Sequence, residues 1–203
     1  QEHELYERST QVPVVHSVSF GYKDIETWHK VALEEAEGHI YSRNTNPTVR
    51  AFEDKVKELE FAEAATSFAS GMAAISNTLA TFLKPGDRVV SIKDSYGGTN
   101  VIFNEFLPPL NIEVSLCETG DYGQLESEIA KSCTLLYLET PTNPTIKITD
   151  IKRLSLAAKK VGALVVVDNT FATPINQNPL LLGADITLHS ASKYLGGHAD
   201  ALG

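Results

Sequence analysis

The sequence contains few cysteines, and this argues against both a zinc-binding protein and a disulfide-rich protein. Its only two cysteines are Cys117 and Cys133, and neither has the Cys-x-x-Cys or histidine spacing of a zinc site. Two cysteines are also too few for a disulfide scaffold. We therefore expect no metal site and interpret both residues as buried thiols.

Positive charge is scarce as well. The chain has 17 lysines and arginines against 26 aspartates and glutamates, which gives a formal net charge of −9. Proteins that bind nucleic acid present a basic surface to the phosphate backbone. Nucleic acid is therefore not expected as a partner.

Long apolar runs are absent too. No stretch approaches the roughly 18 consecutive apolar residues that cross a bilayer. The start, Gln1-Glu2-His3-Glu4, lacks the basic and apolar segments of a signal peptide. We expect no membrane partner and a cytoplasmic location. The 203 residues are 42% hydrophobic and 21% charged, which is typical of a folded globular domain.

The first 48 residues have no regular period. Their aromatic residues are scattered: Tyr6, Phe20, Tyr22, Trp28 and Tyr41. We therefore interpret residues 1–48 as an extended N-terminal arm. A helix is expected to begin at Pro47, because the next apolar residues recur at helical spacing: Val49, Phe52, Val56 and Leu59.

Beyond the arm, short apolar runs alternate with amphipathic segments. The runs cover residues 89–92, 113–116, 135–138, 164–167 and 186–188. Helices are expected over residues 72–83, 124–130 and 151–161. Several runs are apolar on both faces, as buried parallel strands are. The pattern predicts a three-layer α/β/α domain with a mostly parallel sheet.

Polar residues follow four of these runs. Tyr96, Asn143, Asp168 and Lys193 each come shortly after an expected strand. Because the carboxyl ends of parallel strands meet at one edge of a sheet, these residues should lie close together. Loops are polar in general, so each residue alone carries little weight. The four together favour a binding site.

An anion site is also indicated. A turn of mostly small residues, Ser67-Phe68-Ala69-Ser70-Gly71, precedes the helix expected from Met72, whose free backbone N–H groups suit a phosphate. An ordinary N-cap serine followed by glycine would give the same pattern. Ser190 and Ser192 could add two hydroxyl groups to the same anion.

Residues 190–198, Ser-Ala-Ser-Lys-Tyr-Leu-Gly-Gly-His, resemble the lysine signature of the pyridoxal-phosphate enzymes of cysteine and methionine metabolism, the transsulfuration family. The family's phosphate-binding arm, phosphate helix, tyrosine loop and two strand-end motifs are matched in order by residues 41–48, 70–75, 96–99, 139–144 and 167–170. The resemblance covers about residues 40–203. It implies the fold of type I PLP-dependent transferases, with pyridoxal 5′-phosphate (PLP) as cofactor.

The resemblance also implies a role for each strand-end residue. Lys193 matches the lysine that forms the Schiff base, and Asp168 matches the acid that pairs with the pyridine nitrogen. Asn143 matches the residue that hydrogen-bonds the cofactor's phenolic oxygen. Tyr96 matches the ring stacked on the pyridine, with its hydroxyl near the reacting atoms. Lys193 and Tyr96 are therefore the expected catalytic residues.

The remaining cofactor contacts are also carried over from the family. Gly71 and Met72 are expected to offer backbone N–H groups to the phosphate, and Ser190 and Ser192 their hydroxyl groups. The family more often has threonine at the position of Ser192. Since serine keeps the hydroxyl group, we expect binding to persist.

The resemblance further implies an oligomer. Tyr41 and Arg43 match residues that reach the phosphate of a neighbouring subunit, so a dimer of dimers with exchanged arms is expected. The other expected partners are small amino-acid substrates. His189 and His198 lie in no ligand constellation, and we interpret both as structural.

The type of reaction is less constrained. We predict γ-replacement, in which cysteine is joined to an activated homoserine ester, as in cystathionine γ-synthase. The alternatives are γ-elimination, as in cystathionine or methionine γ-lyases, and homoserine sulfhydrylation with O-acetylhomoserine. Gly98 stands where methionine γ-lyases commonly carry cysteine, which counts against that enzyme.

Two other classes are less compatible with the residues present. A silent member of the family that only binds partners would be free to lose Lys193, Asp168 or Tyr96, yet all three are present. A decarboxylase or aminotransferase of the same fold would not be expected to show the motifs at residues 41–48 and 96–99.

The sequence stops at Leu202-Gly203, directly after a run of glycine and polar residues. We expect residues 49–203 to form an incomplete PLP-binding domain. In the family, a smaller C-terminal domain carries the arginine that binds the substrate carboxylate. We expect that domain to be absent from this chain, and little turnover by the chain alone.

Overall fold

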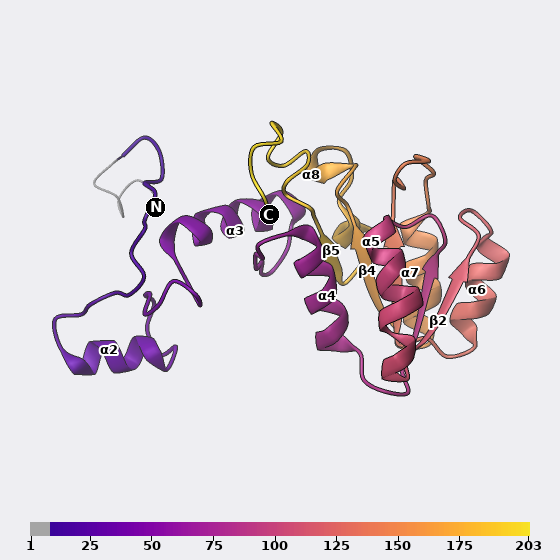
Figure 1. Ribbon diagram of the computed structural model, residues 1–203, viewed down its shortest axis with the longest axis horizontal. Helices are drawn as coiled ribbons and strands as arrows, with labels where there is room; N and C mark the ends of the chain where they lie inside the picture. Colours follow the sequence, from indigo (N-terminus) through magenta and orange to yellow (C-terminus); the bar gives the residue numbers. More distant parts are fainter. Residues whose placement is uncertain (1–8) are drawn as a thin grey trace. The chain divides into compact units, whose positions relative to one another are not determined.

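The computed structural model describes residues 9–203 (Figure 1). The first eight residues, which include the start compared above with a signal peptide and the beginning of the expected arm, lie outside the described residues. The chain forms two compact units. The first comprises residues up to Glu58 with Glu63–Thr66, and the second comprises Leu59–Ala62 with Ser67–Gly203.

The first unit contains a helix that the apolar pattern did not predict. Helix α2 (Ile25–Ala32) lies within the segment that we interpreted as irregular, and that interpretation is wrong for these residues. The Asp24 side chain caps the helix by accepting the N–H of Thr27, and Lys30 pairs with Glu26 one turn away at 3.0 Å. The helix therefore depends on local polar contacts rather than on an apolar stripe, since only Val31 is buried.

Helix α3 (Pro47–Glu60) begins at Pro47, as predicted. Its apolar stripe is not fully covered: Val49, Phe52 and Leu59 keep 40–43% of their surface exposed. Glu60, at the end of the helix, is the buried residue of α3. This helix therefore ends in an acid that needs polar partners inside the protein.

The second unit contains the strands and most of the helices. They are, in chain order, α4 (Gly71–Phe82), β1 (Arg88–Ile92), α5 (Gly97–Val101), η1 (Ile102–Phe106), η2 (Pro108–Leu110), β2 (Glu113–Cys117), α6 (Tyr122–Ala130), β3 (Leu135–Glu139), α7 (Ile151–Lys160), β4 (Leu164–Asp168), α8 (Thr173–Asn176), η3 (Pro179–Leu182) and β5 (Ile186–Leu188). All the predicted strands and helices are present, with small changes at their ends. Segment η1 is a π-helix, which the apolar pattern did not predict.

The strands form one five-stranded sheet in the order β2-β1-β3-β4-β5. Every neighbouring pair is parallel, so the sheet is more regular than the mostly parallel sheet expected. Strand β3 is buried along its whole length, because it lies at the centre of the sheet between two layers of helices. This confirms the expected α/β/α architecture.

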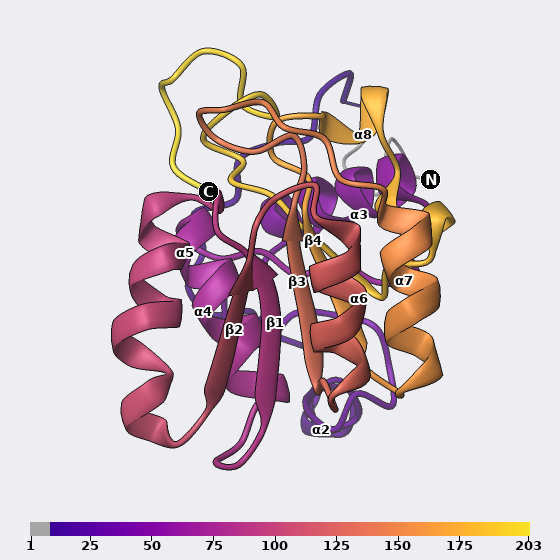
Figure 2. The ribbon, with the colours of Figure 1, turned by 90° about the vertical axis from the view of Figure 1, so that its right-hand side faces the viewer.

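The two faces of the sheet are covered by different helices (Figure 2). On one face, Leu125 of α6 and Leu154 of α7 pack into a core with β1, β3 and β4. On the other face, Leu79 of α4 and Phe103 of η1 pack into a second core. Both cysteines are buried in the first core, as expected.

The loops that follow the strands gather at the edge where the carboxyl ends of the strands meet, at the top of Figure 2. This placement follows from the parallel sheet, because all its strands point to the same edge. None of the described helices is long and apolar enough to cross a membrane.

Candidate cofactor site

A cavity of about 180 Å³ lies at this edge of the sheet, within the second unit. Every predicted site residue of this unit lines it: Gly71, Met72, Tyr96, Asn143, Asp168, Ser190, Ser192 and Lys193. Tyr41 and Arg43 belong to the first unit, where the Arg43 guanidinium lies 5.1 Å from the centre of the Tyr41 ring. The fold thus brings residues from four strand-end loops and the start of α4 to one cavity.

The start of helix α4 forms one wall. The Ser70 hydroxyl caps the helix by accepting the N–H of Ala73 at 3.1 Å, while the N–H groups of Gly71 and Met72 have no acceptor within the helix. A Cβ atom on Gly71 would lie 2.7 Å from the Cβ of Ser190. Glycine is therefore required for α4 to approach this close to Ser190, and the approach forms a cradle of anion-binding donors.

The two serines of the lysine loop differ in their contacts. The N–H of Ser190 donates to the hydroxyl of Thr170 at 2.8 Å, which holds the loop after β5 against the loop after β4. The hydroxyl of Ser192 accepts the N–H of Gly203 at 2.9 Å and donates to the carbonyl of Gly203 at 3.2 Å. In this chain the Ser192 hydroxyl is therefore engaged with the backbone.

Asp168 is a buried acid at the end of β4. Its Oδ1 accepts the N–H of Thr170 at 3.0 Å and the Thr170 hydroxyl at 2.6 Å, and its Oδ2 lies 3.4 Å from the Tyr137 hydroxyl. Burial raises the pKa of Asp168, and the hydrogen bonds from Thr170 oppose this shift. These hydrogen-bond donors, Thr170 and Tyr137, are neutral and do not balance a negative charge on Asp168. A cationic group of a ligand would therefore stabilise the ionised acid.

Tyr96 and Asn143 lie on the loops after β1 and β3. Tyr96 is 44% exposed and lines the cavity at the start of α5. A Cβ atom on Gly98 would lie 2.8 Å from the Met72 sulfur and 2.9 Å from the Tyr96 ring, so glycine allows this ring to lie close to α4. Asn143 lies between two prolines, Pro141 and Pro144, on the other loop.

Lys193 lies in the turn that follows β5. Its N–H donates to the carbonyl of Ser190 at 3.1 Å, and its carbonyl accepts the N–H of Gly197 at 2.8 Å. The residue is exposed, so its amine is accessible to a ligand. It also lines the same cavity as the buried Asp168. The amine and the acid that the predicted site requires thus share one space.

Two further residues of the cavity wall, His189 and Glu139, were not assigned a site role from the sequence. His189 was interpreted as structural. Its side chain is 7% exposed, and its Nε2 lies 2.6 Å from Oε1 of the buried Glu60. The same carboxylate oxygen accepts the Asn169 amide at 2.8 Å. Glu60 and His189 lie 129 positions apart, so no local spacing could have predicted this contact.

His198 is exposed, with its Nδ1 3.1 Å from the carbonyl of Gly196.

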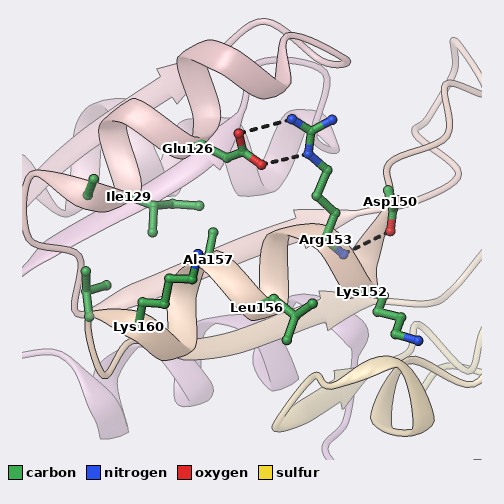
Figure 3. Close-up of a pocket in the computed structure, with 10 residues that line it drawn as sticks. Glu126, Ile129, Asp150, Lys152, Arg153, Leu156, Ala157 and Lys160 are labelled. Carbon is green, nitrogen blue, oxygen red and sulfur yellow. Dashed lines mark hydrogen bonds and ion pairs between the residues drawn. The ribbon is translucent and has the colours of Figure 1, made fainter.

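A second, larger hollow of about 620 Å³ lies between α6 and α7 (Figure 3). Arg153 crosses it and pairs with both oxygens of Glu126, at 2.6 and 3.0 Å. The remaining lining includes Leu156 and Lys160. None of the predicted site residues lines this hollow, so we assign the chemistry to the smaller cavity.

The residues of the cavity fit PLP, the cofactor implied by the resemblance. The cradle at Gly71 offers N–H and hydroxyl donors to a phosphate, and Asp168 offers a buried acid to a protonated ring nitrogen. Lys193 supplies an amine for an aldehyde. These three functions lie around one cavity and match the phosphate, the ring nitrogen and the aldehyde of PLP, while Asn143 lines the same cavity and could meet the phenolic oxygen.

Comparison with known proteins agrees with this fit. The family model described as "Cys/Met metabolism PLP-dependent enzyme" matches residues 1–203. A cystathionine γ-lyase of Bacillus subtilis is 46% identical over 92% of this chain. An L-methionine γ-lyase of Fusobacterium nucleatum is 44% identical over 94% of it. In both cases the match covers 49% of the relative, so the chain spans about half the length of these proteins.

A solved structure has the same fold. The cystathionine γ-synthase of Xanthomonas oryzae, determined in complex with aminoacrylate and cysteine, has a TM-score of 0.89 and 34% sequence identity; the match covers 99% of this chain and 50% of that one. Since the family model matches the full sequence and the fold agrees, this chain belongs to the PLP-dependent enzymes of cysteine and methionine metabolism.

Proposed function

We propose that the whole protein carries out PLP-dependent chemistry at the γ-carbon of an amino-acid substrate, with the cofactor held in the cavity beside Asp168 and Lys193. The observation that supports this most strongly is the shared cavity of a buried acid, an accessible lysine and the anion cradle at Gly71. The bound cofactor supplies an electron sink for substrate carbanions.

Lys193 is proposed as the catalytic base and the covalent anchor. Its Nζ would bind the cofactor's aldehyde group and, once freed, accept the proton from the substrate's α-carbon and return a proton later. The turn that carries it is fixed by backbone hydrogen bonds on both sides of the residue, so the flexible side chain moves while its attachment stays in place.

Asp168 is proposed to hold a proton on the ring nitrogen. Its Oδ1 is oriented by two hydrogen bonds from Thr170, which leaves Oδ2 with one long contact to Tyr137. An acid in this buried position is stabilised in its ionised form by a cationic partner, and it stabilises the protonated ring nitrogen in return.

The other residues are proposed to orient the cofactor. The N–H groups of Gly71 and Met72 and the hydroxyl of Ser190 would bind the phosphate, with Ser192 as a further donor once its hydroxyl is released from Gly203. Tyr96 would cover one face of the ring, and Asn143 would donate to its phenolic oxygen.

For the reaction itself we propose γ-replacement, in which the thiol of cysteine takes the place of the acyloxy group on the γ-carbon of an activated homoserine ester, and this group leaves as a carboxylate. The similarity to a cystathionine γ-synthase determined with cysteine supports this choice. The second candidate is γ-elimination, which the 46% identity to a cystathionine γ-lyase favours.

A product assay on the full-length protein separates the two. With O-acetylhomoserine or O-succinylhomoserine and cysteine, γ-replacement yields cystathionine, whereas γ-elimination from cystathionine alone yields α-ketobutyrate, ammonia and cysteine. Formation of α-ketobutyrate without any cystathionine synthesis would refute γ-replacement. Lys193→Ala should remove the visible absorption of the lysine-bound cofactor in either case.

A further inference from the structure

Glu139 is a buried acid whose two oxygens bind two different loops. It is the last residue of β3 and is 5% exposed. Its Oε2 accepts the N–H of Tyr96 at 2.6 Å, and its Oε1 accepts the N–H of Asn143 at 2.8 Å. One carboxylate therefore connects the loop after β1 to the loop after β3.

The two residues that it binds are those proposed to contact the cofactor ring. Tyr96 lies 43 positions before Glu139 and Asn143 lies 4 positions after it, so the carboxylate combines a distant contact with a local one. Both contacts reach the backbone, where they set the positions of the two side chains without touching the atoms that would meet the cofactor.

The loop after β1 is also held within itself, because the Asn100 side chain donates to the carbonyl of Ser95 at 2.8 Å, but this contact does not reach the loop after β3. Tyr96 is the N-cap of α5, but its side chain makes no capping hydrogen bond. The second tie between the two loops, from Lys147 to Asp94 at 2.8 Å, lies at the surface, where an ion pair contributes little. The buried carboxylate is the tie that is closest to the cavity, since Glu139 itself lines it.

We propose that Glu139 is a positioning residue, whose bridging carboxylate fixes Tyr96 and Asn143 in the geometry that binds the PLP ring. This inference rests on the proposed function, because it takes the cavity to be the cofactor site. It assigns no contact between Glu139 and the reacting atoms.

The substitution Glu139→Gln tests the bridge with almost no change in volume. A glutamine amide has one accepting oxygen, so its NH₂ group would face one of the two N–H donors in either orientation. One loop is therefore released. The matched control is Glu118→Gln, because Glu118 is an exposed acid directly after β2 that pairs with Lys93, directly after β1.

The readouts are the affinity of the full-length protein for PLP, its visible circular dichroism with PLP bound, and its affinity for inorganic phosphate measured by phosphorus NMR. At a pH above the raised pKa of Glu139, loss of a hydrogen bond to its charged carboxylate should weaken PLP binding about tenfold or more in Glu139→Gln and change the dichroism. Phosphate affinity should stay within about twofold, because Glu139 accepts its hydrogen bonds from Tyr96 and Asn143, whereas the cradle is formed by the approach of Gly71 to Ser190. Glu118→Gln should match the parent throughout.

Three results would count against the inference or its basis. Equal PLP affinity and dichroism in Glu139→Gln and the parent would overturn the positioning role. Equal loss of PLP and phosphate affinity in a folded variant would show that Glu139 supports the cavity as a whole. If the full-length parent protein bound no PLP, the proposed function would be overturned, and the inference with it.

A second variant covers the case in which Glu139→Gln does not fold. Glu139→Asp keeps the charge but is one methylene shorter, so its carboxylate cannot reach both backbone N–H groups. If the far-UV spectrum shows that only this variant is folded, the same comparison of PLP with phosphate decides the question.

Discussion

At the scale of single residues, Phe61 adopts a backbone conformation that suits glycine. It directly follows helix α3 and has a φ of 57°. A Cβ atom in this left-handed region meets the following carbonyl, and glycine is favoured just after a helix. The side chain is 65% exposed, so burial offsets little of this strain. Phe61→Gly should raise the free energy of unfolding by about 1 kcal/mol in a urea titration.

Phe61→Ala is the matched control. Alanine removes the aromatic ring but keeps the Cβ atom and hence the strain, so it should bring no gain in stability. An equal gain in both variants would show that the ring, rather than the backbone, is responsible.

Glu139 should also make the stability of the protein depend on pH near neutrality. Burial raises the pKa of Glu139 from 4.5 to about 7, with a further contribution from Asp168, while the N–H groups of Tyr96 and Asn143 oppose the shift. The folded state therefore binds this proton more tightly than the unfolded chain does. The free energy of unfolding should fall as the pH rises from about 4.5 to about 7.

Glu139→Gln has no proton to lose and should remove this part of the pH dependence. Urea titrations of both proteins across this interval give the measurement. As the pH rises, the free energy of unfolding of the parent should fall relative to that of Glu139→Gln. Parallel stability curves would contradict the assigned pKa shift.

At the scale of elements, the sequence predicted the strands and helices whose residues follow a clear local pattern. The apolar runs at 135–138 and 164–167 became β3 and β4, because a short run that is apolar on both faces is typical of a buried parallel strand. Helix α2 was missed although Ile25, Trp28 and Val31 recur at helical spacing, because the helix has only two turns and most of this stripe stays exposed. A short stripe beside a polar cap is easily overlooked, whereas longer patterns that pack against a core are not.

The contact between α4 and the lysine loop gives a prediction at this scale. Gly71→Ala would place a Cβ atom 2.7 Å from the Ser190 Cβ and 2.8 Å from its Cα, and backbone cannot move aside as a flexible side chain can. The helix should shift away from the cradle. We expect affinities for PLP and for inorganic phosphate to fall together, each by about tenfold or more.

Gly97→Ala is the control for this change. Gly97 begins α5, and a Cβ atom there would meet nothing within 4 Å. Alanine also favours helix formation, so stability and phosphate affinity should be equal to those of the parent or slightly higher. If the Gly71 and Gly97 variants behaved alike, the close approach at Ser190 would not be what forms the anion site.

At the scale of the whole molecule, the parallel sheet explains why a site could be predicted at all. Because all its strands point to one edge, the loops after β1, β3, β4 and β5 had to meet there. The hydrogen bonds that hold the loops of the site in place could not be predicted from the sequence. The pair of Glu60 with His189 and the bridge from Glu139 to Tyr96 join residues far apart in sequence, and only the folded chain shows them.

The arm remains a proposal at this scale. We propose that residues 1–48 reach a neighbouring subunit, where Tyr41 and Arg43 would meet the cofactor phosphate of that subunit. The partly exposed apolar side chains of α3, Val49, Phe52 and Leu59, are suited to a further protein surface. On this proposal each site is built from two chains, and the protein is at least a dimer.

Mixing two inactive variants of the full-length protein tests the exchanged arm. Lys193→Ala keeps a normal arm but loses the covalent anchor, and Arg43→Ala keeps the lysine but loses the phosphate contact. In a hybrid dimer, one site then combines the intact lysine of one chain with the intact arm of the other. Unfolding and refolding the two variants together should restore roughly a quarter of the sites, which turnover and PLP affinity would report. If Arg43 instead served its own subunit, the mixture would show no more activity than the two variants measured apart.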